Sequence, residues 1–254
     1  MDNNGIRLNK FLSEAGVCSR READRRIDNG EVKINGMIPE KGAKVMPQDV
    51  VTINGKEVIN NEEPVLIVFN KPLGIVCTSE KREKNNIIDY INYPTRIYPI
   101  GRLDKDSTGL ILLTNQGDIV NKMMRSGNVH EKEYIVSVNK DITEEFLQGM
   151  RSGVPILDTV TRRCIVEKLA RRRFRIVLTQ GLNRQIRRMC EYFDYRVMSL
   201  KRVRVMNIAL NDLPEGKYRN LTKEETRKLY AMIKDSSNAP KIADIDIDYD
   251  NDVE

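Results

Sequence analysis

The sequence predicts an α+β protein with a small α/β domain, followed by a larger domain built on a mostly antiparallel mixed sheet flanked by helices. A chain of 254 residues can hold one large domain and one small one. Short segments with helical apolar spacing are also separated by β-rich runs that turn residues bound. We place the domains at residues 1–62 and 63–234, and expect a disordered acidic tail at 235–254.

The first domain begins with two predicted helices. Apolar residues recur at helical spacing over residues 6–16, and Gly16 stands where the helix would end. The next helix is expected over 19–30, beginning with a capping box formed by Ser19 and Glu22. Two alternating stretches follow, each interrupted by an Asn-Gly pair that suits a type I′ turn, so a small sheet should complete the domain.

The larger domain begins after Pro64 and alternates between the two kinds of element. Strands are expected at 65–70, 96–101, 109–114, 133–138, 173–179 and 202–210. Helices are expected near 116–125, 143–151, 183–193 and 222–233, the last with a capping box of Thr222 and Glu225.

The composition indicates a cytoplasmic protein with no membrane span. No apolar run approaches the ~18 residues that a transmembrane helix needs, and the first ten residues lack the layout of a secretory signal. The four cysteines are scattered without a CxxC pair, so we expect small buried thiols and no metal site.

The charge is unevenly distributed along the chain. The net charge is +6, yet the last twenty residues carry seven acidic side chains against one lysine. Residues 162–204 carry fourteen Lys and Arg against three acidic residues. A field of that sign attracts polyanions, and without an amphipathic anchor it favours nucleic acid over a membrane. A well-solvated surface is the alternative reading.

The stretch GRLDKDSTGLILLTN, residues 101–115, sets polar residues against an apolar run. In an extended segment Arg102 and Asp104 would share one face, and Leu103 would point to the other. Leu110–Leu113 are continuously apolar, which is typical of a strand buried on both faces. We therefore expect a rigid, poorly hydrated Asp104 carboxylate at the end of a buried strand. A purely structural Asp–Arg pair remains an alternative.

The stretch RLNKFLSEAGVCSRREADRRIDNGEVKING resembles the signature of the S-four domain, an RNA-binding fold. The resemblance implies that the second helix presents Arg20, Arg21 and Arg25 to RNA. The alternative is an exposed charged helix that only contains internal ion pairs.

Residues 70–206 contain the stretches NKPLGIV, YPIGRLDKDSTGLILLTNQGD, HEKEYIV, GVPILDTVTRRC and QGLNRQIRRMCE. Together these stretches resemble the bacterial ribosomal RNA pseudouridine synthases with an N-terminal S-four domain, the RsuA family. The resemblance implies isomerisation of a uridine in large-subunit (23S) ribosomal RNA to pseudouridine, without a cofactor or metal. It leaves open a tRNA uridine as an additional substrate.

The resemblance also implies roles for individual residues. Asp104 would attack C1′ of the nucleotide or stabilise an oxocarbenium-like centre there, and the sequence does not choose between these. Tyr134 would stack on the uracil and take part in proton removal. Arg102 would enter the RNA stack as the uridine is flipped out. Lys105 belongs to the same loop and is expected to contact RNA.

The last motif departs from the pattern of many relatives. They have an arginine that pairs with the catalytic aspartate where this chain has Leu182. We expect Arg187 to face Asp104 instead, with Arg184 as the alternative partner or as a phosphate contact. Arg188 is a further expected RNA contact.

Three rival functions follow from the same residues. A ribosome-associated binding protein would use the basic surface without catalysis. A nuclease using Asp104 and Asp106 would need a further acidic cluster for metal, and a glycosidase would need a second positioned carboxylic acid. For the synthase we expect a monomer whose two domains grip a stem-loop of 23S ribosomal RNA.

Overall fold

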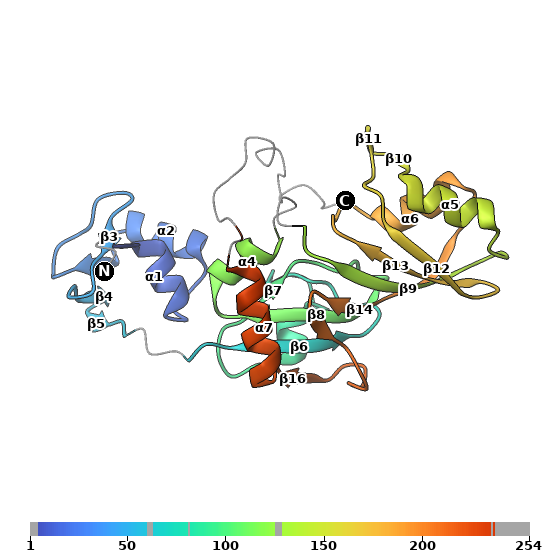
Figure 1. Cartoon of the computed structure of the whole chain (residues 1–254). Helices are drawn as coiled ribbons and strands as arrows, with labels where there is room; N and C mark the ends of the chain where they lie inside the picture. The colour runs from blue at the N-terminus through green and yellow to red at the C-terminus, as the bar shows by residue number, and fades with distance from the viewer. Residues whose placement is uncertain (1–4, 60–62, 81, 125–128, 235, 237–254) are drawn as a thin grey trace. The chain divides into compact units, whose positions relative to one another are not determined.

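The computed structural model describes residues 5–59, 63–80, 82–124, 129–234 and 236 (Figure 1). The chain forms two compact units. Unit 1 consists of Met1–Val65, Tyr93–Arg96 and Asn115–Gly117, and unit 2 consists of Leu66–Asn92, Ile97–Thr114 and Asp118–Glu254. The predicted domain boundary at 62/63 borders a segment outside the described residues and stays a prediction. The predicted acidic tail also lies outside the described residues, apart from Ser236.

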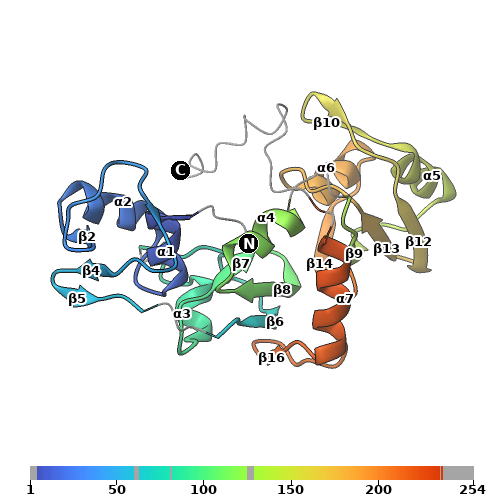
Figure 2. The ribbon, with the colours of Figure 1, turned by 60° about the vertical axis from the view of Figure 1, so that its left-hand side comes forward.

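Unit 1 contains two helices that pack on short strands (Figure 2). Its elements are β1 (Ile6–Arg7), α1 (Leu8–Glu14), α2 (Arg20–Asp28), β2 (Val32–Ile34), β3 (Lys44–Val45), β4 (Val51–Ile53) and β5 (Lys56–Glu57). Leu8 and Leu12 of α1 and Ala23 of α2 are buried together with Val32 and Val51. This core joins both helices to both small sheets.

The turn residues of unit 1 behave as the sequence predicts. Gly16 has a φ of 72°, the left-handed conformation that ends α1. In the two Asn-Gly pairs of the small sheet, Asn35-Gly36 and Asn54-Gly55, both residues have positive φ, which is the requirement of a type I′ turn. The predicted capping box of α2 forms in one direction: Ser19 Oγ accepts from the Glu22 N–H at 3.1 Å. The Glu22 carboxylate itself pairs with the arginines of the next turn, Arg25 and Arg26.

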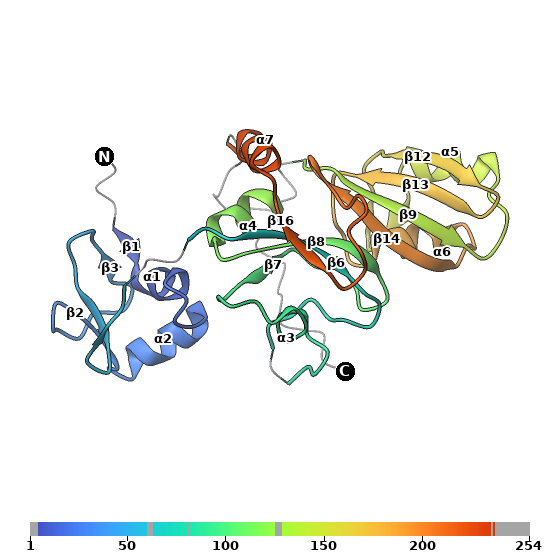
Figure 3. The same cartoon turned by 90° about the horizontal axis from the view of Figure 1, so that it is seen from below.

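Unit 2 is built around a nine-stranded sheet in the order β12-β13-β9-β14-β8-β6-β16, with β15 paired to β14 and β7 to β8 (Figure 3). The strands are β6 (Leu66–Lys71), β7 (Tyr98–Ile100), β8 (Thr108–Thr114), β9 (Lys132–Val138), β12 (Ile165–Ala170), β13 (Arg173–Leu178), β14 (Val197–Val205), β15 (Ile208–Ala209) and β16 (Tyr218–Asn220). β10 (Pro155–Ile156) and β11 (Thr159–Val160) form a separate hairpin. Every pair in the large sheet is antiparallel except β8 with β14, so the predicted mostly antiparallel sheet is confirmed.

Helices cover the two halves of this sheet separately (Figure 1). They are α3 (Ile87–Ile91), α4 (Gly117–Met124), α5 (Glu144–Ser152), α6 (Gln185–Tyr192) and α7 (Lys223–Ile233). One core packs α5 and α6 on β9, β13 and the start of β14. The other packs α4 and α7 on β6, β8 and the end of β14. β14 thus belongs to both cores, and β8 lies where they meet.

The structure differs from the predicted elements in a few places. The strand predicted over 202–210 is two strands, because Met206 with a φ of 52° reverses the chain between Val205 and Ile208. The sequence prediction missed β1, β3, α3, β10, β11, β12 and β16, as well as the first part of β14, and it assigned residues 6–7 of β1 to the first helix. All but α3 and β14 are short or edge elements, whose apolar patterns are weak.

Among the described residues, no helix is both long and apolar enough to cross a membrane.

The cysteines are buried or partly buried, as predicted. Burial raises the pKa of Cys164 to about 11 and that of Cys190 to about 12, which keeps both thiols protonated near neutral pH.

Candidate active site

The loop between β7 and β8 carries Asp104. Along this loop Arg102 is exposed, Leu103 is buried and Asp104 is partly exposed, which is the predicted alternation. The Leu103 N–H donates to Cys77 Sγ at 3.4 Å, so Leu103 is anchored beneath the loop. The Asp104 side chain is 38% exposed. The expectation of a poorly hydrated carboxylate is therefore wrong, because Leu103 and not Asp104 faces the interior.

Asp106 is the carboxylate that holds the loop in place. Arg184 donates to both of its oxygens, at 3.3 and 3.2 Å. Arg187 Nη2 donates to the Asp106 backbone carbonyl at 2.8 Å and lies 3.2 Å from Asp106 Oδ2. Two guanidinium groups of the α6 region thus clamp a single residue of the loop.

Asp104 has a different and weaker contact. Its nearest ion-pair partner is Arg184, whose Nη1 lies 3.7 Å from Asp104 Oδ2. The prediction that Arg187 faces Asp104 is thus replaced by the alternative, Arg184. The reason is geometric: Arg187 lies on the buried side of α6 and reaches the loop backbone at Asp106 and Ser107.

The start of α6 brings these arginines to the loop. Arg184 adopts the left-handed conformation, with a φ of 46°, immediately before the helix. The Gln185 side chain accepts from the Leu182 N–H at 3.0 Å, which fixes the turn ahead of it. The pKa of Arg184 is raised, chiefly by its hydrogen bonds to Asp106, and burial partly opposes this. Arg188 is half-buried and donates to Asn183.

Lys71 is a buried cation that the sequence analysis missed. It is fully buried at the end of β6, and its Nζ donates to the carbonyls of Pro72 and Ile75, at 2.9 and 2.8 Å. The turn that it holds meets the Asp104 loop, since the Gly74 N–H donates to the Lys105 carbonyl at 2.9 Å. Burial lowers the pKa of Lys71, and the nearby Cys77, Asp104 and Asp106 act in the opposite direction. In the sequence this lysine directly follows the apolar run VLIVFN, and that position was the signal that could have indicated its burial.

The pairing of three neighbouring strands places Tyr134 in line with the C-terminal end of the Asp104 loop. Tyr134 on β9 is opposite Arg202 on β14, and Arg202 is opposite Gly109 on β8. Gly109 has a φ of 101°, and a Cβ there would lie 2.2 Å from the Arg202 carbonyl oxygen. Only glycine permits this approach of β8 to β14. The loop enters β8 one residue earlier, at Thr108.

Two more cations lie on the Tyr134 side of the sheet and were also missed. Arg202 is buried, and its guanidinium carbon lies 6.0 Å from the Tyr134 ring centroid. Lys132 is buried two residues before Tyr134 on the same strand. Its pKa is lowered to about 8 by burial and by the charge of Arg202. In the sequence, Arg202 and Lys132 are basic residues inside β-rich runs, and that position was the signal that could have identified them as buried cations.

Most of the predicted RNA-binding residues are exposed, and Arg188 is the half-buried exception. Arg20, Arg21 and Arg25 are exposed on α2, and Arg102 and Lys105 are exposed on the Asp104 loop. The described residues hold no group of three or more His, Cys, Asp or Glu placed to bind a metal ion. The acidic cluster that the nuclease reading requires is therefore missing from the described part of the chain.

Comparisons with known proteins identify the family of the chain. Residues 65–192 match the family model described as RNA pseudouridylate synthase, and residues 6–51 match the S4 domain. The chain is 55% identical to the dual-specificity RNA pseudouridine synthase RluF of Escherichia coli (strain K12), over 95% of this chain and 84% of that protein.

Two further matches extend the comparison. The chain is 35% identical to the ribosomal large subunit pseudouridine synthase B of Bacillus subtilis (strain 168), over 92% of this chain and 99% of that protein. A crystal structure of a pseudouridylate synthase superposes with a TM-score of 0.65 at 28% identity, covering 88% of this chain and 99% of that one. The chain therefore belongs to the RNA pseudouridylate synthase family of enzymes, with an S4 domain in its N-terminal part.

Proposed function

We propose that this enzyme converts one uridine of large-subunit (23S) ribosomal RNA to pseudouridine, with Asp104 as the reacting carboxylate. The observation that carries the proposal is the partly exposed Asp104, 38% accessible, on a loop that two arginines clamp through Asp106. A carboxylate that is fixed by its neighbours and open on one side suits attack on a bound nucleotide.

The reaction needs only groups that the chain supplies. The N1–C1′ bond breaks, the uracil turns, a C5–C1′ bond forms, and the proton leaves C5 while N1 gains one. Asp104 would act at C1′, as nucleophile or as charge stabiliser. Tyr134 would stack on the uracil and assist proton removal, although a phenol needs help from its neighbours to act as a base. Arg102 would occupy the gap left by the flipped nucleotide.

RNA is held by basic side chains in this proposal. Arg20, Arg21 and Arg25 of α2 would contact one part of a stem-loop, and Lys105, Arg184 and Arg188 would contact another. Arg187 would support catalysis by fixing the loop. A tRNA uridine is the proposed second substrate, in keeping with the words "dual-specificity" in the name of the Escherichia coli relative. A cytoplasmic monomer completes the proposal.

Release of tritium from ribosomal RNA labelled at uracil C5 tests the proposal directly. The purified protein should release tritium from one site per RNA, and mapping of pseudouridine should place it in 23S RNA. The Asp104→Asn variant should bind the same RNA and release none. Binding without release by the wild-type protein would favour the binding-protein alternative, and cleavage of the RNA that EDTA abolishes, without tritium release, would favour the nuclease.

A further inference from the structure

Arg202 lies where one edge of β8 changes partner. β14 pairs with β8 only at Thr108 and Gly109, whereas β7 pairs with β8 from Leu112 to Thr114. Between these two ladders the β8 edge has no strand partner. β7 leads directly into the loop that carries Asp104, so this gap adjoins the base of the active-site loop.

The Arg202 side chain bridges this gap. Its Nε donates to the Leu110 carbonyl at 2.7 Å, a short bond to β8 just past the last β14 pair. Its Nη1 lies 3.5 Å from the Arg102 carbonyl, two residues before Asp104, which is at the long limit for a hydrogen bond. The same guanidinium faces Tyr134. One planar group therefore contacts β8, the Asp104 loop and the aromatic residue.

Arg202 makes these contacts without a carboxylate partner among the described residues. It is 4% exposed, and an arginine at such a site is usually paired with an acidic group. Its contacts are instead two backbone carbonyls and an aromatic ring. The charged side chain of Arg202 thus fixes the backbone at the start of the Asp104 loop.

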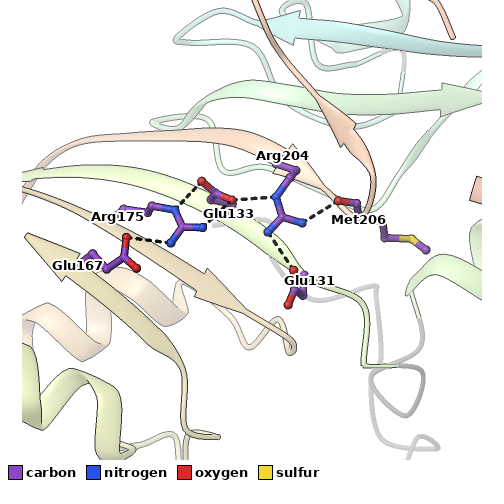
Figure 4. Close-up of polar contacts among 6 residues, drawn as sticks. All are labelled: Glu131, Glu133, Glu167, Arg175, Arg204 and Met206. Atoms are coloured by element: carbon purple, nitrogen blue, oxygen red, sulfur yellow. Dashed lines mark hydrogen bonds and ion pairs between the residues drawn. The ribbon is translucent and has the colours of Figure 1, made fainter. Parts of the chain in front are cut away.

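Arg204, two residues further on, provides a contrast, and Figure 4 shows its contacts with Glu131 and Glu133. Successive odd or even positions of a regular strand share a face, but β14 changes register against β9 between Arg202 and Arg204. Arg204 therefore points away from Tyr134 and donates to Glu133 at 2.8 Å and to Glu131 at 2.9 Å.

Further contacts complete this acidic network. Arg175 donates to Glu133 and Glu167 (Figure 4). The pKa of Glu133 is lowered, first by its hydrogen bond to Arg175 and then by that to Arg204, against an opposing effect of burial. Arg204 is thus an arginine that carboxylates neutralise, on the same strand as one that is not neutralised.

We propose that Arg202 is a positioning residue for the isomerase reaction: it fixes the Asp104 loop and the Tyr134 ring relative to one another through Leu110, Arg102 and the aromatic face. This proposal rests on the proposed function. It assigns Arg202 no contact with the substrate, only control over where two groups that contact it are held.

The experiment compares Arg202→Ala with Arg204→Ala, a matched pair on one strand. Loss of Arg202 should reduce the single-turnover rate by about 100-fold, the effect of misplacing a reacting group by about 1 Å, with RNA affinity nearly unchanged. Millimolar guanidinium chloride, but not the same concentration of NaCl, should restore part of that rate by entering the vacated space. Arg204→Ala should lower stability, keep most of its rate and show no such rescue.

A conservative variant and a second measurement cover the remaining outcomes. Arg202→Lys keeps the charge but not the forked donors, so its rate should stay low even if Arg202→Ala does not fold. Hydrogen exchange should show faster exchange of loop amides 103–108 in the Arg202 variants only. A native rate in both Arg202 variants, or equal losses without rescue in Arg202→Ala and Arg204→Ala, would overturn the proposal. Absence of tritium release by the wild-type protein would instead reject the proposed function, and the hydrogen exchange comparison would still test the role of Arg202.

Discussion

Asp104 and Asp106 are two carboxylates of one loop, two residues apart, and they differ mainly in their partners. Their side chains are similarly exposed, 38% for Asp104 and 48% for Asp106. Asp106 has both oxygens bonded to Arg184 and a further contact with Arg187. Among the described residues, the Asp104 side chain has a single ion-pair partner, Arg184, at 3.7 Å.

The comparison teaches that pairing, and not exposure, separates the two roles. A carboxylate whose oxygens are already bonded to two guanidinium groups has little capacity left for a substrate. The oxygens of Asp104 are left available, while its backbone is held by the neighbours that clamp Asp106. In the proposed mechanism, Asp106 is the structural residue that keeps the reacting residue, Asp104, rigid.

The largest expected effect comes from replacing each aspartate by asparagine. Asp104→Asn should lower the rate by about 10⁴-fold or more, because it removes the reacting group, and should leave the midpoint of urea unfolding nearly unchanged. Asp106→Asn should keep measurable activity but lower the free energy of unfolding by about 1 kcal/mol, a value limited by solvent exposure. Tritium release and urea titration of both variants measure this. Equal rates in the two variants would contradict the different roles of Asp104 and Asp106.

Replacing Arg187 and Arg184 one at a time tests the comparison of the two aspartates further. Arg187→Met removes the bond to the Asp106 carbonyl and should shift the loop, with a loss of about 100-fold in single-turnover rate. Arg184→Met removes an exposed ion pair of about 1 kcal/mol, which corresponds to about fivefold. RNA affinity measured alongside separates loss of a phosphate contact from loss of rate. A larger rate loss for Arg184→Met would mean that the 3.7 Å contact matters more than the clamp.

Lys132 is a buried cation without a carboxylate partner in the described part of the chain, and it tests what such a charge does to stability. Its folded pKa of about 8 lies below the ordinary lysine value of 10.5, so the unfolded chain binds more protons between these values. Stability should therefore rise with pH over that window, by about 2–3 kcal/mol between pH 7 and 10. Lys132→Met should flatten this rise and be the more stable protein at pH 7. Urea unfolding of both proteins across the pH range gives the difference, and parallel curves would contradict it.

The smallest effect is expected for the arginines of α2 in unit 1. Charge reversal at Arg21 and Arg25 should weaken RNA binding by about tenfold and reduce the slope of log affinity against log salt by about 1.5–2. Turnover of bound RNA should not change, in contrast to the loop variants. Lys33→Glu on the neighbouring β2 is the control for general electrostatics. An unchanged slope in the Arg21 and Arg25 variant would remove α2 from the RNA contact.

Local signals in the sequence were enough for much of the fold. The Asn-Gly turns, the end of α1 at Gly16 and the apolar run of β8 each depend on neighbouring residues, and each was predicted correctly. The choice of Asp104 over Asp106 as the reactive residue came from the family resemblance, and the structure supplies a physical reason for it.

The rest depended on contacts between distant residues. Arg202 and Leu110 are 92 positions apart, and the register change that turns Arg204 away from Arg202 leaves no trace in the residue pattern. The sequence pattern predicts that Arg187 lies on the helix that became α6. It does not predict that the side chain contacts Asp106 and not Asp104, because that depends on how α6 packs against the loop. Lys71 lies in a matching stretch, yet only the fold shows that it is buried beneath the loop.

The narrow contact between β8 and β14 has a mechanical consequence. Two residue pairs join these strands, whereas six join β6 to β8. A joint this small should flex more readily than the ladders beside it, and exchange broadening in NMR spectra confined to the flanking amides would reveal the motion. Because Tyr134 lies on one side of the joint and Asp104 on the other, such rocking would widen or narrow the gap between them as far as the Arg202 side chain, which contacts both sides, allows.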